Sequence, residues 1–278
     1  MNPKYPIYIP SKGRWQSRHT MKALDRMGVP YRVVVEPQEY DLYAEQIGEP
    51  RLLKLPFSNL GQGSIPARNF IWQHAELEGH ARHWVLDDNI AGFNRLNRNR
   101  QHRVTTGTLF RCAEDFADRY ENVGLAGFQY DHFVKSKWPW PAFVANTRIY
   151  SCILIDTSLP FRWRGRYNED TDLSLRVLKA GLCTIQFNAF TQEKATTMTM
   201  TMRGGNTEEL YQGDGRLKMA QSLVDQHPDV VKVSFKWNRP QHHVNYAPFK
   251  GNALRYRPDV AVPAGVNNYG MNLKLKVA

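Results

Sequence analysis

Two carboxylates stand directly before a stretch with helical hydrophobic spacing, at Glu169 and Asp170. Apolar residues follow on one helix face, and Gly181 ends the pattern. We expect Asp170 or Thr171 to cap this helix, because its first turn is positively polarised. A carboxylate fixed there on a short loop is well placed to act as a general base. A plain capped surface helix is the commoner meaning of such a pair, so the rest of the chain must decide.

A second cluster of side-chain oxygens is formed by Asp87, Asp88 and Asn89, which follow the apolar segment 84–86. Such a cluster is what Mg²⁺ or Mn²⁺ with attached phosphates requires, and the alternative is a turn rich in Asp and Asn. His243, in a polar segment that we expect to be irregular (237–246), could complete a metal site; the alternative is a surface loop.

Positive charge and aromatic rings recur near these carboxylates. Arg68 lies in the first turn of a predicted helix behind the glycine-containing loop 59–64, and such a loop can hold phosphate through backbone N–H groups. Two further runs mix cations with aromatic rings, which suits stacking on bases and holding a phosphodiester backbone. Their candidate residues are Trp138, Trp140, Arg162, Trp163 and Arg164. For the first run, the alternative is a proline-rigidified lid. The basic segment 94–103 is expected to be a loop, which either contacts phosphates or is solvated and mobile.

The elements that must position these residues begin with a strand, polar loop, helix and strand over residues 5–35. This βαβ pattern predicts a parallel sheet, and in open sheets of this kind ligands lie beyond the carboxyl ends of the strands. Ser11, Lys12, Arg14 and Glu36 stand at those ends. Further helices are expected at residues 40–47, 106–120 and 208–227, and further strands at 52–55, 84–86, 123–130, 150–155, 183–188, 196–202 and 230–236. Residues 1–248 are predicted to form one domain, followed by a basic tail at 249–278 that is partly disordered or wraps the core.

Composition narrows the class of protein. The 278 residues are 42% hydrophobic and 23% charged, an ordinary globular balance, and the longest apolar runs are too short for a membrane span. The three cysteines form no CxxC pair, and the N-terminus lacks the apolar core of a signal peptide, so a reducing, cytoplasmic location is expected. The net charge of +11 and the pI of about 9.6 favour a polyanionic partner: nucleic acid, an anionic membrane surface or a phosphorylated donor.

Taken in order, four short motifs resemble those of GT-A glycosyltransferases of the large inverting family 2 type. They are IPSKGR at 9–14, ARN at 67–69, LDDN at 86–89 and EDTDLSLR at 169–176. More narrowly, the chain is similar to the bacteriophage glycosyltransferases associated with TET/JBP-type pyrimidine oxygenases. The resemblance implies an α/β, GT-A (Rossmann-like) fold with a mostly parallel central sheet flanked by helices, here with a basic C-terminal extension.

The resemblance also implies a role for each matched position. Asp170 would be the base that deprotonates the acceptor, and Glu169 would orient the acceptor. Asp88 and Asn89 would hold Mn²⁺ or Mg²⁺, although Asn89 stands where the family often carries a carboxylate. The residues that would bind a UDP-sugar donor are Pro10, Ser11, Arg14, Glu36, Arg68 and Asp87.

The implied reaction is transfer of a sugar, with inversion, to the hydroxyl of a 5-hydroxymethylpyrimidine in DNA. If the chain is phage-encoded, this takes place in the host cytoplasm. Two alternatives stay open: a GT-A enzyme acting on a glycan, lipid-linked or protein acceptor, and a non-enzymatic nucleic-acid-binding module with a degenerate GT-A core. The sequence identifies neither the sugar nor the modified base, and it does not indicate the oligomeric state.

Overall fold

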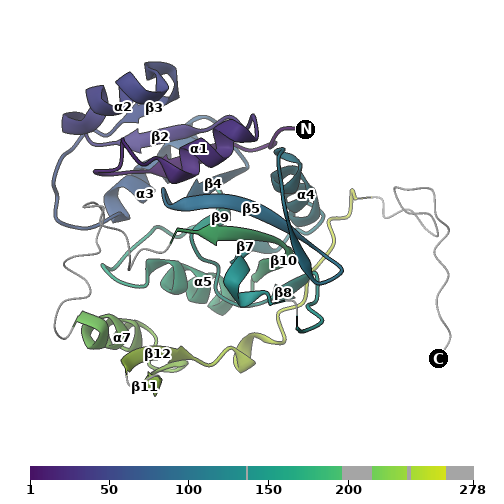
Figure 1. The fold of residues 1–278 in the computed structure, drawn as a ribbon. Helices are drawn as coiled ribbons and strands as arrows, with labels where there is room; N and C mark the ends of the chain where they lie inside the picture. Colours follow the sequence, from purple (N-terminus) through teal and green to yellow (C-terminus); the bar gives the residue numbers. More distant parts are fainter. Residues whose placement is uncertain (136, 196–214, 237–238, 261–278) are drawn as a thin grey trace, which may run out of the picture.

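The computed structural model describes residues 1–135, 137–195, 215–236 and 239–260, and its centre is a ten-stranded sheet (Figure 1). The strands are β1 (Ile7–Pro10), β2 (Arg32–Val35), β3 (Leu52–Lys54), β4 (Arg82–Leu86), β5 (Ile90–Asn97), β6 (Arg100–Arg103), β7 (Val123–Tyr130), β8 (Phe143–Ala145), β9 (Cys152–Asp156) and β10 (Cys183–Lys194), with β11 (Val231–Lys236) and β12 (Arg239–Val244) in a separate ribbon. The helices are α1 (His19–Arg26), α2 (Tyr40–Ile47), α3 (Ile65–Leu77), α4 (Thr108–Ala117), α5 (Glu169–Lys179) and α7 (Gly215–Gln226).

The sheet has the order β3-β2-β1-β4-β9-β7-β10-β5-β6, with β8 paired to β10. Its first four strands are parallel, as the βαβ pattern predicts. The strand β9 runs antiparallel between β4 and β7, so β7 and β10 again share the direction of β4. The predicted α/β class with a mostly parallel central sheet is therefore confirmed.

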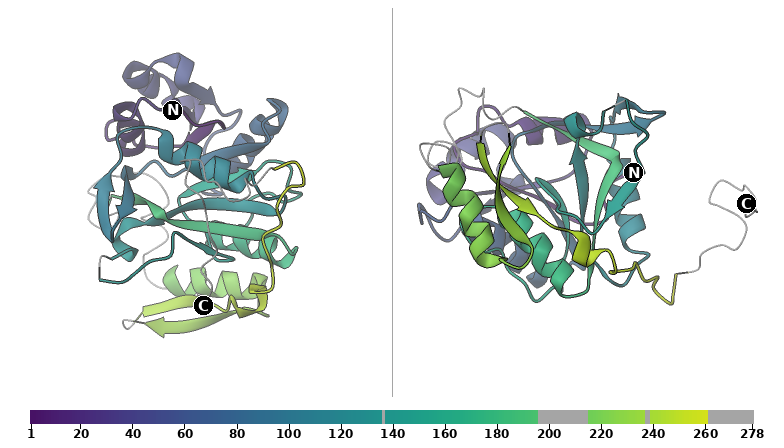
Figure 2. Two further views of the ribbon diagram at one scale, coloured as in Figure 1. Left: turned by 90° about the vertical axis from the view of Figure 1, so that its right-hand side faces the viewer. Right: turned by 90° about the horizontal axis from the view of Figure 1, so that it is seen from below.

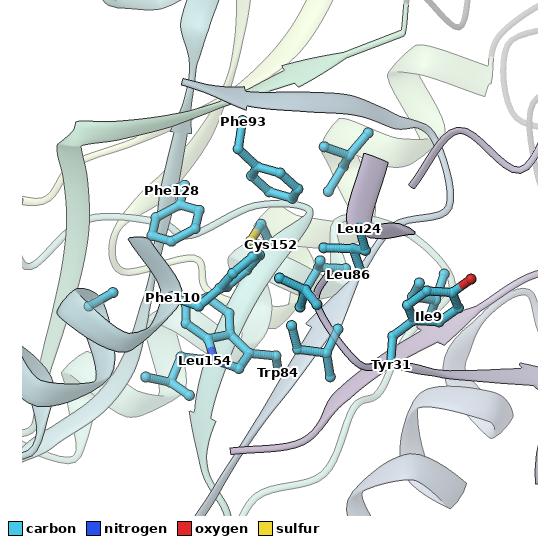
Figure 3. Close-up of a cluster of buried hydrophobic side chains, with 14 of the residues drawn as sticks. Ile9, Leu24, Tyr31, Trp84, Leu86, Phe93, Phe110, Phe128, Cys152 and Leu154 are labelled. Atoms are coloured by element: carbon cyan, nitrogen blue, oxygen red, sulfur yellow. The ribbon is translucent and has the colours of Figure 1, made fainter. Parts of the chain in front are cut away.

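Helices cover both faces of the sheet because successive strand residues point to opposite sides. One apolar cluster joins α1 and α4 to the sheet residues of one face, and the other joins α3 and α5 to the opposite face. In the first cluster, Trp84, Phe93, Phe110 and Phe128 pack with ring centroids 5.1–6.2 Å apart (Figure 3). This three-layer core fixes the ends of the central strands, where the candidate residues lie.

Two segments that we expected to be irregular are β-hairpins. Residues 94–103 fall within β5 and β6, joined by a turn in which Arg98 and Asn99 adopt positive φ. That backbone twist is the one that closes a two-residue hairpin, and Asn tolerates it well. Residues 239–244 form β12, which pairs in register with β11. In both cases cross-strand hydrogen bonding outweighs a polar, weakly patterned sequence.

The strand β10 is longer than the predicted 183–188. It pairs with β7 as far as Phe187, shifts register, and pairs with β7 again at Thr191 and Gln192. From Phe190 to Lys194 its other edge pairs with β5. The side-chain amide of Gln192, fully buried, donates to the carbonyl oxygens of Phe128 and Tyr150 and so ties the strand to its neighbours. The extension carries Lys194 to the same edge of the sheet as the end of β4.

The segment after residue 214 forms a small unit against the far side of α5 (Figures 1 and 2). Leu175 and Leu178 of α5 pack with Leu223 of α7, Val231 of β11 and Phe249. From there the chain runs along the sheet to an isolated bridge between Tyr120 and Tyr256. The predicted boundary between a domain at 1–248 and a tail at 249–278 stays a prediction. Within the first of these ranges, α7 and the ribbon form a layer of their own against α5. The predicted strand 196–202, residues 208–214 of the predicted helix and residues 261–278 lie outside the described residues.

No helix in the described ranges is long and apolar enough to span a bilayer.

Candidate functional site

The ends of β1, β2 and β4 bring the predicted donor-side residues together. Ser11, just after β1, donates to Asp88 over 2.7 Å, and Arg14 forms an ion pair with the same carboxylate. Lys12 contacts Glu36 over 2.7 Å beyond β2. Tyr43 of α2 closes the group with a 2.7 Å hydrogen bond to Ser11. These loops therefore form one polar surface at the carboxyl ends of the parallel strands.

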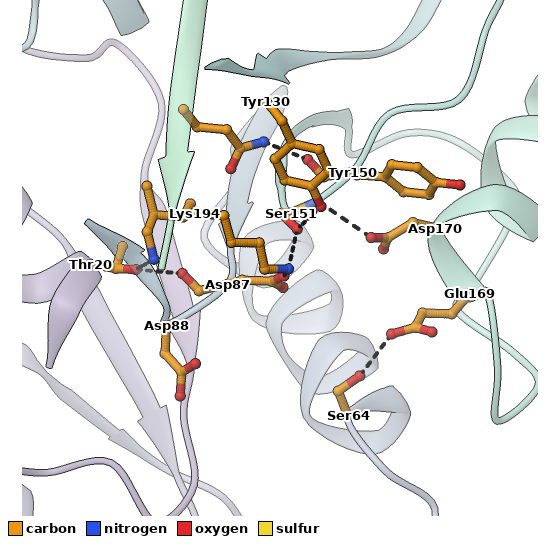
Figure 4. A network of polar contacts seen from close by, with 12 residues as sticks. Thr20, Ser64, Asp87, Asp88, Tyr130, Tyr150, Ser151, Glu169, Asp170 and Lys194 are labelled. Atoms are coloured by element: carbon orange, nitrogen blue, oxygen red, sulfur yellow. Dashed lines mark hydrogen bonds and ion pairs between the residues drawn. The ribbon is translucent and has the colours of Figure 1, made fainter. Parts of the chain in front are cut away.

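The turn that carries Asp87, Asp88 and Asn89 is held by α1. The Thr20 hydroxyl donates to the carbonyl oxygen of Asp87 over 2.6 Å and accepts the N–H of Ile90 over 2.8 Å (Figure 4). The N–H of Asp87 bonds to the carbonyl oxygen of Ser151 over 2.7 Å. Because the backbone of this turn is fixed from both sides, its carboxylates have defined positions.

Arg68 of α3 lies at the centre of the site. Its guanidinium contacts Asp87 and Asp170 over 2.9 Å each and approaches Glu169 at 3.9 Å. The side chain is only 5% exposed, and it lies 4.5 Å from the ring centroid of Trp163. One buried cation is thus shared among three carboxylates from two different elements.

Asp170 lies in the first turn of α5. Its carboxylate also accepts a long, 3.4 Å hydrogen bond from the N–H of Ser151. Burial raises its pKa to about 7, and the nearby carboxylates Glu169 and Asp87 add to this rise, while Arg68 opposes it. A carboxylate with this pKa exchanges a proton near neutral pH, which a general base requires.

The predicted cap of α5 is wrong. The capping position is Asn168, in the left-handed conformation that Asn tolerates, and its side chain donates to the carbonyl oxygen of Met219 instead of capping. Neither Asp170 nor Thr171 caps the helix: Asp170 faces Arg68, and the Thr171 hydroxyl bonds to that of Tyr150 over 3.0 Å. The predicted end is confirmed, because Gly181 takes positive φ and closes a Schellman turn.

Lys194 is a site residue that the sequence did not reveal. Its ammonium contacts Asp87 over 2.9 Å and the Ser151 hydroxyl over 2.8 Å (Figure 4). Tyr130 also bonds to Ser151, over 2.7 Å. Burial alone raises the pKa of Asp87, but Lys194 and Arg68 hold it below its usual range. The signal in the sequence that could have indicated Lys194 is the continuation of the predicted strand 183–188 into the polar residues that follow it.

The residues predicted to hold a metal do not fit one as they are arranged. Asp88 is already bound by Arg14 and Ser11, and no cluster of three or more His, Cys, Asp or Glu suitable for a metal occurs in the described part of the chain. The side-chain oxygen of Asn89 is buried without a hydrogen-bond partner among the described residues. His243 lies on β12 opposite Lys232 and bonds to neither Asp88 nor Asn89. We therefore derive no step through a metal.

The candidate acceptor residues fall into two groups: some already have partners within the protein, and others are exposed. Trp163 is 2% exposed and packs against Arg68, so it is not available for stacking on an acceptor, contrary to our expectation; it supports the site from beneath. Arg164 is bound to Asp172, and Arg162 contacts Glu76 over 2.5 Å. Composition could not reveal that these side chains already have partners.

Trp138, in contrast, is 64% exposed and does offer a free ring. It lines an open hollow of about 560 Å³ together with Phe133, Lys135, Pro139, Trp140 and Pro141. The Trp140 indole is oriented by a 2.8 Å hydrogen bond to the carbonyl oxygen of Lys135. Of the two basic–aromatic runs, the first therefore retains the predicted character of a stacking surface.

Comparison with known proteins identifies the family of the chain. A family model described as TET-associated glycosyltransferase matches residues 5–205, which include every residue of the carboxylate network described above. No curated protein matches the chain in sequence. Among solved structures, one described as a nucleotide-diphospho-sugar transferase from Desulfovibrio desulfuricans G20 shows 13% identity and a TM-score of 0.39, covering 66% of this chain and 80% of that one. Similarity at that level does not establish a shared fold.

Proposed function

The chain belongs to the TET-associated glycosyltransferase family, and from this premise we propose that it moves a sugar from a nucleotide-sugar donor to the hydroxyl of a 5-hydroxymethylpyrimidine in DNA. Family membership makes the protein a glycosyltransferase. The DNA acceptor is supported by the TET association in the family name and by the net charge of +11, which suits a polyanion. The reaction would take place in the cytoplasm, which is that of the host cell if the chain is phage-encoded.

The observation that carries the proposal is the Asp170 carboxylate, 13% exposed in the first turn of α5 and 2.9 Å from the Arg68 guanidinium, with its pKa raised to about 7. A hydroxymethyl group is a weak nucleophile at neutral pH. As its oxygen forms a bond to the anomeric carbon, Asp170 takes the hydroxyl proton, and the bond from that carbon to the nucleoside diphosphate breaks. The leaving diphosphate keeps the electron pair. Attack from the face opposite the diphosphate inverts the configuration.

Charge stabilisation falls to cations already present at the strand ends. Arg68 touches both Asp170 and Asp87, so it lies between the base and the donor side. As the resemblance implies, Arg68 would face the diphosphate, Ser11 and Arg14 would lie near the nucleotide, and Glu36 would contact the nucleoside. Fixed cations at a developing negative charge lower the barrier because they need not reorganise. Glu169, which accepts from Ser64 over 3.2 Å, would orient the acceptor.

The acceptor base must leave a duplex to reach Asp170, as bases do for other enzymes that modify them. Trp138 and Trp140 are our candidates for stacking on it or on its neighbours, since aromatic stacking contributes about 1–3 kcal/mol per base and tolerates any sequence. Arg162, half-exposed, is a candidate for a phosphate contact.

The test is incubation of the protein with DNA containing 5-hydroxymethylcytosine or 5-hydroxymethyluracil and a panel of UDP-sugars, followed by digestion to nucleosides and mass spectrometry. We expect a sugar-bearing nucleoside with at least one donor, and none with Asp170→Asn. Absence of any such nucleoside across all donors, together with transfer to a glycan, lipid-linked or protein acceptor, would sink the proposal and favour the alternative acceptor class. Absence of UDP-sugar binding would favour a binding module.

A further inference from the structure

The ribbon formed by β11 and β12 has two chemically different faces. Residues directly opposite in an antiparallel pair point to the same side, and successive residues alternate. The pairs Val231–Val244 and Val233–His242 are buried or half-buried toward α7, whose helix packs on the ribbon. The intervening pairs, Lys232–His243, Ser234–Gln241 and Lys236–Arg239, share the other face and point away from α7.

That outward face carries only basic and neutral polar side chains. The segment 231–244 contains no Asp or Glu, and Lys232, Lys236, Arg239 and His243 are all exposed. Neither Lys232 nor Arg239 forms an ion pair with any residue that the structure describes. Lys232 and Arg239 therefore give this face a positive field that is available to an external anion.

The cations are regularly spaced. Side chains on one face of a strand recur every second residue, so Lys232 and Lys236 are about 14 Å apart along β11. Arg239 lies opposite Lys236, and His243 opposite Lys232. A rigid two-stranded ribbon with cations on one face is a shape that fits along a duplex, where β-ribbons are known to enter or follow a groove.

The ribbon is attached to the catalytic helix. Its apolar face, with α7, packs on Leu175 and Leu178 of α5, the helix that begins with Glu169 and Asp170. One turn before Leu223 in α7, the carbonyl oxygen of Met219 accepts the side-chain hydrogen bond of Asn168. Figure 2, seen from below, shows the ribbon and α7 beside α5. A partner held on the ribbon is therefore held at a fixed position relative to Asp170.

A second connection runs through Arg148. Burial lowers the pKa of His242 to about 4, and the charge of Arg148 contributes, so the inner face of the ribbon adjoins this arginine. Arg148 lies 5.2 Å from the ring centroid of Tyr150, whose hydroxyl bonds to Thr171 beside Asp170. Arg148 and Tyr150 thus lie between the neighbourhood of His242 and the first turn of α5.

We propose that the outward face of the β11–β12 ribbon, formed by Lys232, Lys236, Arg239 and His243, binds the phosphate backbone of duplex DNA beside the nucleotide being modified. This inference rests on the proposed function and adds a DNA-docking surface separate from the catalytic residues. Phosphate contacts of this kind position the protein without reading sequence. His243 is then a backbone-facing residue and not a metal ligand.

The experiment is duplex-DNA binding by fluorescence anisotropy over a series of NaCl concentrations, comparing the full chain with Lys232→Gln/Arg239→Gln. Each phosphate contact contributes about 0.9 to the slope of log K against log salt, so the double variant should lose about 2 from the slope. In sugar transfer to DNA, we expect a higher KM with kcat retained. The matched control is Arg119→Gln/Arg257→Gln, two exposed cations beside α4, away from the ribbon. It should keep the wild-type slope.

Folding and the donor site are checked by calorimetric binding of UDP, which both double variants should retain. If the wild type glycosylates DNA while the ribbon variant keeps the full salt slope, the ribbon proposal is overturned and the proposed function stands. An equal loss of slope in both double variants also overturns it, because a diffuse field and not the ribbon then binds DNA. If the ribbon variant loses slope but no sugar reaches DNA with any donor, the proposed function fails and the docking surface stands.

Discussion

Two aspartates two residues apart on α5 have opposite environments. Asp170 faces the site with a pKa of about 7, and Asp172, fully buried, has a pKa of about 2. Burial favours the neutral form of both. The pKa of Asp172 is nevertheless low because His227, Arg164 and Arg176 all bond to its carboxylate. The difference therefore lies in the partners that each carboxylate has and not in its depth.

The balance of charge explains the contrast. Around Asp172, two arginines serve one carboxylate. Around Asp170, the buried cation Arg68 is divided among three carboxylates, and Lys194 is taken by Asp87. The first cluster has more positive than negative charge, so Asp172 stays ionised, and through His227 it ties α5 to the end of α7. The second is left with excess negative charge, so one carboxyl group stays close to protonation and can accept a proton from a substrate.

Replacing the base tests the functional half of this comparison. Asp170→Asn should lower the rate of sugar transfer by about 10²–10⁴-fold, the usual contribution of a general base. Its thermal unfolding temperature at pH 8 should not fall. A carboxyl whose pKa is raised in the folded state stabilises the fold below the unfolded pKa and loses that contribution as the pH rises through about 7. Transfer within a few-fold of wild type would remove Asp170 from the mechanism.

The structural half is tested by Asp172→Asn. Removing the carboxylate partner of Arg164 and Arg176 should lower the free energy of unfolding by about 3–5 kcal/mol, measured by urea denaturation. The kcat per folded molecule should stay close to the wild-type value at a temperature where the variant is native. If stability is unchanged and kcat collapses, Asp172 belongs to the site and the contrast with Asp170 is wrong.

Lys194 offers a smaller change within the site. Lys194→Gln removes one of two cations from Asp87, a charge-assisted hydrogen bond whose loss costs about 1.5–3 kcal/mol. We expect kcat/KM to fall by about tenfold to a hundredfold, with Lys194→Arg recovering part of the loss. Steady-state kinetics with donor and DNA varied separately measure this. Wild-type kinetics in the Gln variant would show that Lys194 only fills space at the end of β10.

The sequence predicted those parts of the site that depend on local pattern. Asp87 and Asp88 follow a short apolar strand, and Asp170 opens an amphipathic helix, so their positions could be deduced from neighbouring residues. The position of Lys194 could not be deduced, because β10 reaches it through a register shift against β7 and by pairing with β5, a strand that lies partly in a segment expected to be a loop. The strand depends on contacts distant in sequence, and propensity does not report those.

The direction in which a side chain points was the second feature that the sequence could not predict. Trp163 and Trp138 sit in similar mixtures of cations and aromatic rings, yet one is 2% and the other 64% exposed. The mixture shows that aromatic rings and charges are near each other, but the neighbouring elements decide which ring faces water. The prediction of the α5 cap was wrong for a related reason. Asn168 adopts the left-handed backbone conformation, and its side chain bonds to α7, which lies far along the chain.

The pH dependence of kcat/KM for the wild-type enzyme tests the central claim most directly. Asp170 must be ionised to accept the proton, so kcat/KM for sugar transfer should rise tenfold per pH unit below about pH 7 and level off above it. The residual activity of Asp170→Asn should lack this limb. A wild-type profile that is flat between about pH 5 and 8, or a limb near pH 7 that persists in the variant, would contradict Asp170 as the base.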